Sequence, residues 1–171
     1  KFVFRVKPDG GDPPGIDKFK CRYCGKGFYQ HKGVHYQCTY APSCSATGSR
    51  IVVAISTEMG WPLHGMDVSN AFLNGWLLPG TVLFVKPPPT VYVPPGYGLR
   101  LAKGLYGTMQ GGNRWAAHKH QKLTKLRYTR NTQEPSIYHR LDKHDIVITS
   151  IIVDDFQLTG WPPSALARAK H

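Results

Sequence analysis

Two adjacent aspartates, Asp154 and Asp155, stand between two apolar, β-branched segments of the chain. Segments 145–153 and 156–159 both favour strands, and two strands separated by two residues indicate a β-hairpin with both carboxylates at its tip. A third carboxylate, Asp67, ends another short strand-like segment. Like charges at the end of an apolar hairpin repel each other and are costly to desolvate, and a divalent cation relieves both effects.

The chemistry that such carboxylates support is phosphoryl transfer. Magnesium prefers oxygen ligands and usually takes one or two carboxylates together with substrate phosphates. Three carboxylates at one sheet edge suit two-metal catalysis, in which ions roughly 3.5–4 Å apart hold the attacking and leaving oxygens. The alternative is that Asp154 and Asp155 form only a hydrophilic turn, and the dipeptide alone does not decide between these interpretations.

The charge of the chain indicates an anionic partner. Its 171 residues, one domain or part of a larger one, hold 22 Lys and Arg against 10 Asp and Glu, a net charge of +12. Phosphate backbones are the favoured partner, since a basic amphipathic helix that would indicate a membrane surface is not evident. The start resembles no signal peptide, and the longest apolar segment, 146–153, is too short to span a bilayer. We therefore expect an intracellular protein, in a cytoplasmic particle or the nucleus, with no membrane partner.

The cysteines and histidines of segment 21–44 raise a zinc interpretation. Cys21 and Cys24 have the spacing of a first zinc-binding half, and His31 and His35 that of a second. Only six residues separate the halves, against roughly twelve to fifteen in a Cys2His2 finger. The spacing therefore favours free thiols, and a small zinc-binding module remains the alternative interpretation.

Local patterns predict the elements that must position these residues. Segments 8–17 and 88–99 are rich in Pro and Gly and predict exposed loops, whereas 81–85 predicts a strand. Segment 51–57 fits a strand or a helix equally well. Apolar residues at helical spacing on a basic background predict an amphipathic helix over 110–127. Helices and strands mixed in this order favour an α+β fold.

Five segments of the chain occur in the same order and with similar spacing as the motif blocks of a known family. They are Lys20-Cys-Arg-Tyr-Cys-Gly-Lys-Gly-Phe-Tyr-Gln, Gly60-Trp-Pro-Leu-His-Gly-Met-Asp-Val-Ser-Asn-Ala-Phe-Leu-Asn-Gly, Val85-Lys-Pro-Pro, Leu105-Tyr-Gly-Thr-Met-Gln through Trp115, and Ile152-Val-Asp-Asp-Phe-Gln-Leu-Thr-Gly. Together they resemble the motif blocks of copia-type retrotransposon reverse transcriptases, over roughly residues 1–160.

The resemblance implies an α+β fold with fingers and palm regions and an antiparallel sheet. We expect the thumb to be absent, because the chain departs from the family by ending at His171. The fingers would comprise approximately residues 1–57 and 76–109, and the palm approximately 58–75 and 110–165. It also implies an RNA-directed DNA polymerase that acts on an RNA or DNA template, a primer and deoxynucleoside triphosphates, with Mg²⁺ or, in its place, Mn²⁺. No oligomeric state follows from the sequence.

The resemblance also assigns roles to particular residues. Asp67, Asp154 and Asp155 match the metal-binding aspartates, and Val68 would offer its backbone carbonyl to one ion. Six residues match nucleotide-binding positions: Lys20 and Arg22 at the triphosphate, Asn70 and Ala71 beneath the nucleotide, Phe72 as a steric gate against a ribose 2′-hydroxyl, and Gln110 near the 3′-hydroxyl. Without the resemblance, Phe72 would be interpreted as a core residue and Gln110 as a helix cap.

Four residues at three sites depart from the family pattern. Ile152 replaces a usual Tyr, Gly111-Gly112 replaces a small residue followed by Pro, and Glu134 replaces a usual Asp. None of these changes removes a carboxylate that would bind metal. They leave a second interpretation open, in which the chain is a catalytically inactive, nucleic-acid-binding remnant of a decayed retroelement.

Overall fold

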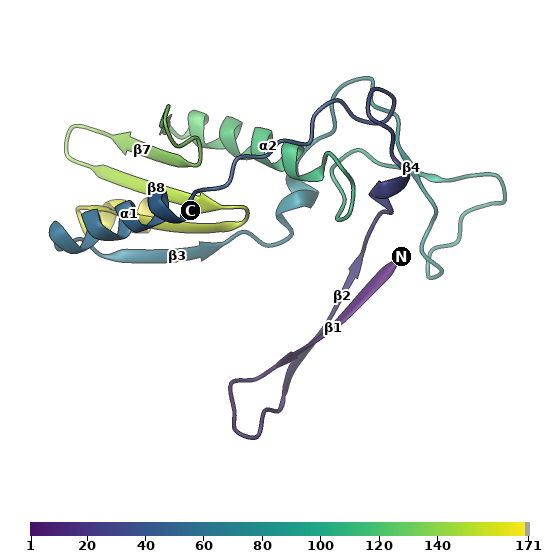
Figure 1. The fold of residues 1–171 in the computed structure, drawn as a ribbon, viewed down its shortest axis with the longest axis horizontal. Coiled ribbons are helices and arrows are strands. Elements are labelled where there is room, and N and C mark those ends of the chain that lie inside the picture. Colours follow the sequence, from purple (N-terminus) through teal and green to yellow (C-terminus); the bar gives the residue numbers. More distant parts are fainter. Residues whose placement is uncertain (170–171) are drawn as a thin grey trace. The chain divides into compact units, whose positions relative to one another are not determined.

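The computed structural model describes residues 1–169, which form two compact units. Unit 1 comprises Lys1–Thr39 and Phe72–Arg114, and unit 2 comprises Tyr40–Ala71 and the chain from Trp115 onward. Figure 1 shows the helices and strands of both units along the chain. Among the described residues, no helix is long and apolar enough to cross a bilayer.

Unit 1 contains two small antiparallel strand pairs. Its elements are β1 (Phe2–Pro8), β2 (Ile16–Tyr23), the 3₁₀ turn η1 (Gly27–Tyr29), β4 (Phe84–Val85) and β5 (Leu99–Arg100), with most of the 3₁₀ turn η2 (Ala71–Asn74). Strand β1 pairs with β2, and β4 pairs with β5. The loop expected at 8–17 joins β1 to β2, where the Asp9 carboxylate accepts backbone hydrogen bonds from Gly11 and Gly15.

Unit 2 is built on a five-stranded antiparallel sheet in the order β3-β9-β8-β7-β6. Its elements are α1 (Ala46–Glu58), β3 (Leu63–Asp67), most of α2 (Gly111–Lys125), β6 (Thr129–Arg130), β7 (Ile137–Leu141), β8 (Ile146–Ile152), β9 (Asp155–Trp161) and α3 (Pro163–Ala169). The expected combination of helices with an antiparallel sheet is confirmed. The division into fingers and palm stays a prediction.

One face of this sheet forms the core beneath α2. Strand register places Tyr138, Thr149 and Leu158 in one row of that face, all buried. Helix α2 contributes Trp115 and Leu123, spaced so that they lie on the same side of the helix. Burial of these aromatic and aliphatic side chains is the main stabilising contribution of the unit.

A lysine interrupts the buried side of α2. Lys119 lies one helical turn after Trp115 and one before Leu123, and only 4% of its surface is exposed. Burial, with a smaller contribution from the nearby Arg130 guanidinium, lowers the pKa of Lys119 from 10.5 to about 8. A charged group in such a place is costly, because desolvation disfavours its protonated form.

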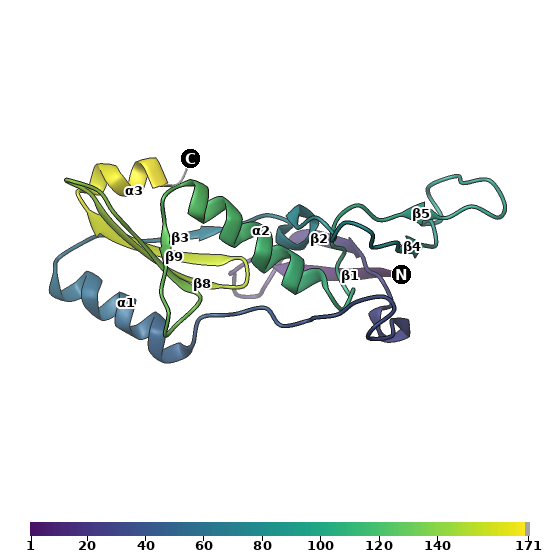
Figure 2. The same ribbon diagram turned by 90° about the horizontal axis from the view of Figure 1, so that it is seen from above.

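The opposite face of the sheet is covered by α1, as Figure 2 shows. The Ser49 hydroxyl donates a hydrogen bond to the side chain of Gln157 on β9. Segment 51–57, which fitted either a strand or a helix, lies within α1, which begins directly after the cap residue Ser45. The Ser45 hydroxyl accepts the Gly48 N–H at 3.0 Å, which satisfies one of the free donors at the helix start.

Two boundaries differ from the sequence predictions. The turn between β8 and β9 consists of Val153 and Asp154, so Asp155 is the first residue of β9 and lies opposite Ile152. The sequence prediction of a turn at Asp154-Asp155 was wrong by one residue, because β-branching alone does not fix the register. The strand predicted over 81–85 is restricted to Phe84–Val85, since its partner β5 has only two residues.

Candidate active site

Asp67 and Asp155 lie directly opposite each other on neighbouring strands, at the end of the sheet in unit 2. The next pair, Val68 and Asp154, is joined by a hydrogen bond from the Val68 N–H to the Asp154 carbonyl oxygen at 3.0 Å. In an antiparallel sheet, hydrogen-bonded and non-hydrogen-bonded residue pairs alternate along the strands. Asp67 and Asp155 therefore form a non-hydrogen-bonded pair, in which side chains approach most closely. Their Cβ atoms are therefore about 4.5–5.5 Å apart, on the α1 side of the sheet.

The turn beside this pair has a constrained backbone. Val153 adopts a φ of +57°, an unfavourable conformation for a β-branched residue that costs about 1–3 kcal/mol. The buried Trp115 indole N–H donates a hydrogen bond to the Val153 carbonyl oxygen at 2.7 Å. Helix α2 therefore fixes the turn that holds Asp154 and leads directly into Asp155.

Within the described part of unit 2, no basic side chain compensates these carboxylates. None of Asp67, Asp154 and Asp155 takes part in an ion pair there. Across the described residues, no three His, Cys, Asp or Glu side chains form a ready cluster for a metal ion. The fold therefore brings two carboxylates face to face, with the third next to them in the turn.

This arrangement fits a hard divalent cation. All the charged donors at the strand ends are carboxylate oxygens, and Asp67 and Asp155 are exposed while Asp154 is half-buried. Magnesium binds one or two carboxylates and completes its shell with water and substrate phosphates, so a ready three-residue cluster is not required. The expected contribution of the Val68 carbonyl stays a prediction.

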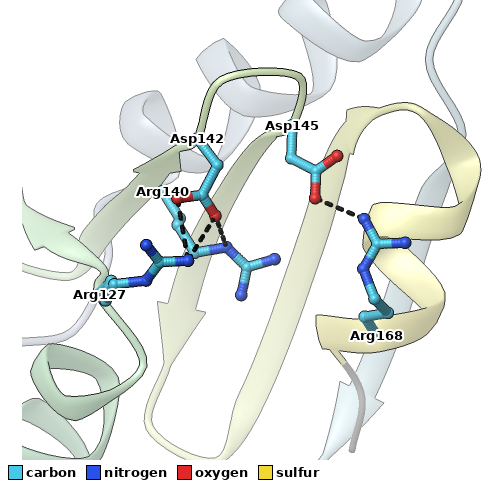
Figure 3. A network of polar contacts seen from close by, with 5 residues as sticks. All are labelled: Arg127, Arg140, Asp142, Asp145 and Arg168. Atoms are coloured by element: carbon cyan, nitrogen blue, oxygen red, sulfur yellow. Dashed lines mark hydrogen bonds and ion pairs between the residues drawn. The ribbon is translucent and has the colours of Figure 1, made fainter.

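The other end of the same sheet also carries aspartates, but each has an arginine partner (Figure 3). In the β7–β8 turn, Asp142 forms ion pairs with Arg127 at 3.1 Å and with Arg140 at 3.5 Å. Asp145, the last residue of that turn, forms an ion pair with Arg168 of α3. Both carboxylates are thus neutralised within unit 2.

In unit 1, Arg22 and Phe72, which both match nucleotide-binding positions, contact the same residue, Tyr106. The Arg22 guanidinium lies over the ring of Tyr106, 5.3 Å from its centroid. The Tyr106 ring in turn makes an edge-to-face contact with Phe72, with centroids 5.3 Å apart. Tyr106 belongs to the motif segment that begins at Leu105, and the resemblance assigns it no role. The contact orients the Arg22 fork and the Phe72 ring together.

Gln110 is buried in unit 1 and held by two polar partners. Its side-chain oxygen accepts a hydrogen bond from Gln30 at 3.0 Å, and its amide nitrogen donates to the His35 carbonyl oxygen at 3.5 Å. Gln30 also accepts the Met109 N–H at 2.8 Å. Gln110 stands immediately before α2, where its own carbonyl oxygen accepts the N–H of Arg114. It is therefore positioned by its neighbours as well as located at the start of the helix.

Glycine residues hold the segment that follows β2 close to the segment that contains Tyr106. The Gly27 N–H donates to the Gly107 carbonyl oxygen at 2.9 Å, and a Cβ on Gly27 would lie 2.2 Å from that oxygen. Gly107 has a φ of +79°, and a Cβ there would lie 2.4 Å from the Gly25 carbonyl oxygen. No other residue fits either position without a backbone shift.

The remaining predicted site residues are divided between the units. Lys20 lies on β2 opposite Arg5, in unit 1. Asn70, with a φ of +54°, and Ala71, which is buried, lie in unit 2, three and four residues after the end of β3. The structure thus groups Asp67 with Asp155, and Arg22 with Phe72.

The cysteine and histidine residues of the zinc interpretation form no such group among the described residues. Cys21 is exposed on β2, and the Cys24 thiol lies 3.9 Å from the Arg22 carbonyl oxygen. The His35 Nδ1 accepts the His31 N–H at 2.9 Å, which ties the two histidines to the local loop.

The sequence over residues 1–170 matches the family described as reverse transcriptase (RNA-dependent DNA polymerase). The chain therefore belongs to the reverse transcriptase family. It is 30% identical over 166 residues to the retrovirus-related Pol polyprotein from transposon RE1 of Arabidopsis thaliana, across 96% of the chain and 11% of that protein. No solved structure matches it.

Two further relatives are also transposon proteins. The chain is 30% identical over 160 residues to the Pol polyprotein from transposon RE2 of Arabidopsis thaliana, across 93% of the chain and 11% of that protein. It is 25% identical over 173 residues to that from transposon TNT 1-94 of Nicotiana tabacum, across 99% and 13%. The resemblance to copia-type retrotransposon reverse transcriptases is thereby confirmed. The chain spans about a tenth of the length of these relatives.

Proposed function

We propose that this chain is the catalytic core of an RNA-directed DNA polymerase, which extends a primer on a template by nucleotidyl transfer. The primer 3′-hydroxyl oxygen attacks the α-phosphorus of a deoxynucleoside triphosphate, a new P–O bond forms, and the bond to pyrophosphate breaks. Membership of the reverse transcriptase family supports the reaction class. The observation that carries the proposal for this chain is the carboxylate pair Asp67 and Asp155, which face each other and form no ion pair within the described part of unit 2.

Asp67 and Asp155 would hold the divalent cations, with Asp154 as the third ligand. When bound, the ions neutralise the charge that develops on the transferred phosphoryl group and orient the attacking and leaving oxygens. The antiparallel register keeps the two carboxylates facing each other, and the Trp115 hydrogen bond holds the adjoining turn. Such preorganisation is the main contribution of a protein to phosphoryl transfer.

The contacts of unit 1 would orient the incoming nucleotide. The Arg22 guanidinium, with Lys20 beside it on β2, would bind the triphosphate through its forked donors. Phe72, fixed by Tyr106, would exclude a ribose 2′-hydroxyl, and the Gln110 segment would contact the sugar. Asn70 and Ala71 would support the nucleotide beneath it.

Primer extension tests this proposal. The original chain and an Asp154→Asn, Asp155→Asn variant are incubated with an RNA template, a DNA primer, deoxynucleotides and Mg²⁺ or Mn²⁺. A matched control, Asp142→Asn with Asp145→Asn, removes the same charge from the other end of the sheet. We expect extension by the original and the control, and none by the first variant.

Two outcomes would contradict the proposal. Equal loss of extension in both variants would indicate a general effect of charge or folding. No extension by any of the proteins, with binding of primer–template retained, would favour the catalytically inactive, nucleic-acid-binding remnant.

A further inference from the structure

Unit 1 contains a large pocket that the proposed reaction does not use. The pocket has a volume of about 870 Å³, which lies within the range of small-molecule sites in proteins. All of its lining residues belong to unit 1, and none of them is among the residues assigned to metal or nucleotide binding. The pocket is therefore a candidate for a separate ligand.

Aromatic side chains form much of the apolar wall of this pocket. Phe2 of β1 and Tyr23 of β2 contact each other edge to face, with ring centroids 5.3 Å apart. Tyr29 of η1 and Phe84 of β4 also line the pocket, and 66% and 63% of their surfaces are exposed. Rings left exposed around a hollow favour a ligand that covers them, because their burial gains hydrophobic free energy.

Hydrogen bonds between distant segments hold the walls together. The Tyr23 hydroxyl donates to the Lys86 carbonyl oxygen, which joins the end of β2 to the segment after β4. The Cys24 N–H donates to the Lys1 carbonyl oxygen at 2.8 Å. The pocket is thus formed before any ligand binds, and a preformed pocket loses less conformational entropy on binding.

The lysines that line the pocket give it a positive charge. They are Lys1, Lys26 and Lys86, and no Asp or Glu lines it. None of the three forms an ion pair with the residues that the structure describes. Lysine stems can pack along an apolar wall while their ammonium groups stay at its mouth. The pocket therefore suits a ligand that carries negative charge.

The amide, hydroxyl and imidazole side chains of Gln30, Thr108 and His35 line the pocket but already have partners. The Gln30 amide donates to the Gln110 side chain at 3.0 Å, and the Thr108 hydroxyl donates to the Leu105 carbonyl oxygen at 2.7 Å. The His35 Nδ1 accepts a backbone N–H of its own loop. A nucleobase has many donors and acceptors, and leaving them unpaired in this pocket is costly. A ligand whose only polar group is an acid fits better.

We propose that this pocket binds a small aromatic molecule with a single acidic group, a carboxylate or a sulfonate. The rings of the ligand stack against Tyr23 and Phe84, and its acidic group lies near the ammonium groups of Lys26 and Lys86. The inference does not rest on the proposed function, because it involves neither metal nor nucleic acid.

Fluorescence of anilinonaphthalene sulfonate tests the inference, because this aromatic sulfonate reports apolar surface that it can cover. The full chain is titrated against it in the absence of metal and nucleic acid. Phenylnaphthylamine, which has the same rings without the acid, is the matched neutral compound. We expect saturable binding of the sulfonate, and binding of the neutral compound that is about tenfold weaker.

Two variants of exposed lining residues identify the contacts. Lys26→Gln with Lys86→Gln should weaken binding of the sulfonate about tenfold and leave binding of the neutral compound unchanged, because only the sulfonate is attracted by charge. Phe84→Ala should weaken binding of both compounds by roughly two- to tenfold, because it removes a ring from the wall.

Matched controls change residues of the same kinds outside the pocket. Lys122→Gln with Lys143→Gln removes two exposed cations of unit 2, so both double variants lower the net charge by two from +12, to +10. Phe19→Ala removes a ring of β2 that is 77% exposed and does not line the pocket. We expect both controls to bind the two compounds as the original chain does.

Alkylation of the cysteines gives an independent location of the ligand. Cys24 lines the pocket and is half-buried, whereas Cys21 is exposed on β2 and does not line it. Saturating anilinonaphthalene sulfonate should slow the reaction of Cys24 with iodoacetamide and leave that of Cys21 unchanged. Mass spectrometry of the separated peptides measures both rates.

Several results would overturn the inference. Absence of saturable binding, equal affinity for the two compounds, or unchanged affinity in the Phe84→Ala variant would each do so. An equal loss in the Phe19→Ala variant would place the ligand on the β1–β2 hairpin, and unprotected Cys24 would place it outside the pocket. Displacement of the sulfonate by an equal concentration of deoxyadenosine triphosphate would assign the pocket to the nucleotide instead.

Discussion

The five-stranded sheet of unit 2 carries aspartates at both ends, and the partners of these aspartates differ between the two ends. At the β7–β8 turn, Asp142 and Asp145 are neutralised by Arg127, Arg140 and Arg168 (Figure 3). At the β8–β9 turn, Asp67 and Asp155 face each other across two strands, and no ion pair within the described part of unit 2 compensates them.

The difference separates a structural use of carboxylates from a functional one. Exposed ion pairs contribute little, about 0–1 kcal/mol, and serve to remove the cost of an isolated charge. A like-charged pair instead lowers stability, and an external cation or a substrate relieves that repulsion. The turn beside that pair also contains a strained residue, Val153, and such strain clusters at functional sites.

The largest effect should follow from removing one member of the facing pair. Asp67→Asn leaves Asp154 and Asp155 intact, yet we expect roughly a 10²–10³-fold loss of primer extension rate, because the cross-strand pair is broken. Single-turnover incorporation with Mg²⁺ measures this loss. An activity within a fewfold of the original would show that the aspartates of the turn suffice without Asp67.

The next effect concerns Lys119, a cation on the buried side of α2 that forms no ion pair with the residues the structure describes. With a pKa of about 8 in the folded state, against 10.5 unfolded, Lys119 binds fewer protons when folded between those values. The cost of its charge is therefore complete at pH 7 and disappears as the pH rises from 8 to 10.5. We expect Lys119→Met to raise the free energy of unfolding at pH 7, by on the order of 2–3 kcal/mol.

Urea denaturation of both proteins at several pH values measures this difference. The advantage of the Lys119→Met variant should shrink steadily between pH 8 and pH 10, as the original chain loses the proton from Lys119. A constant advantage at every pH would assign the effect to packing rather than to the buried charge.

A smaller effect should distinguish the two ends of the sheet by metal binding. At a free Mn²⁺ concentration ten times the dissociation constant, a cation at the facing pair stabilises the fold by about 1.4 kcal/mol. Thermal unfolding with and without Mn²⁺ measures this gain. Asp155→Asn should remove it, and Asp142→Asn should retain it. Loss of the gain in both variants would place the metal elsewhere.

The smallest effect is on the free energy of unfolding in the absence of metal, which should change with opposite sign at the two ends of the sheet. We expect Asp155→Asn to raise the free energy of unfolding by about 0.2–1 kcal/mol, because it removes a like-charge repulsion. Asp145→Asn should lower it by about 0.2–1 kcal/mol, because it removes an ion pair with Arg168. Chemical denaturation in a chelating buffer compares them, and two shifts of the same sign would contradict the comparison.

Much of the fold near the site could be predicted from local patterns. The strand that ends at Asp67, the hairpin that precedes and follows Asp154, and the helix over 111–125 are all present. Each depends on neighbouring residues: β-branched runs for the strands and apolar spacing for the helix. The exact turn was missed, because register depends on which side chains enter the core beneath Trp115.

Contacts between distant segments could not be predicted in this way. The ring of Tyr106 supports both Arg22 and Phe72, and Gln30 and His35 hold Gln110. No local periodicity indicates such partners, since they come from different segments of unit 1. Tyr106 lies in one of the motif segments, but only the structure shows what its ring contacts.

The sequence by itself determined the kinds of chemistry available: three aspartates at strand ends, a surplus of cations, and five segments in the order of a reverse transcriptase. The tertiary structure decided that Asp67 faces Asp155 and that residues of β1, β2 and β4 line one pocket of unit 1. The physical reason is that strand pairing sets which side chains meet, and pairing is fixed by long-range register and core packing rather than by neighbours in the chain.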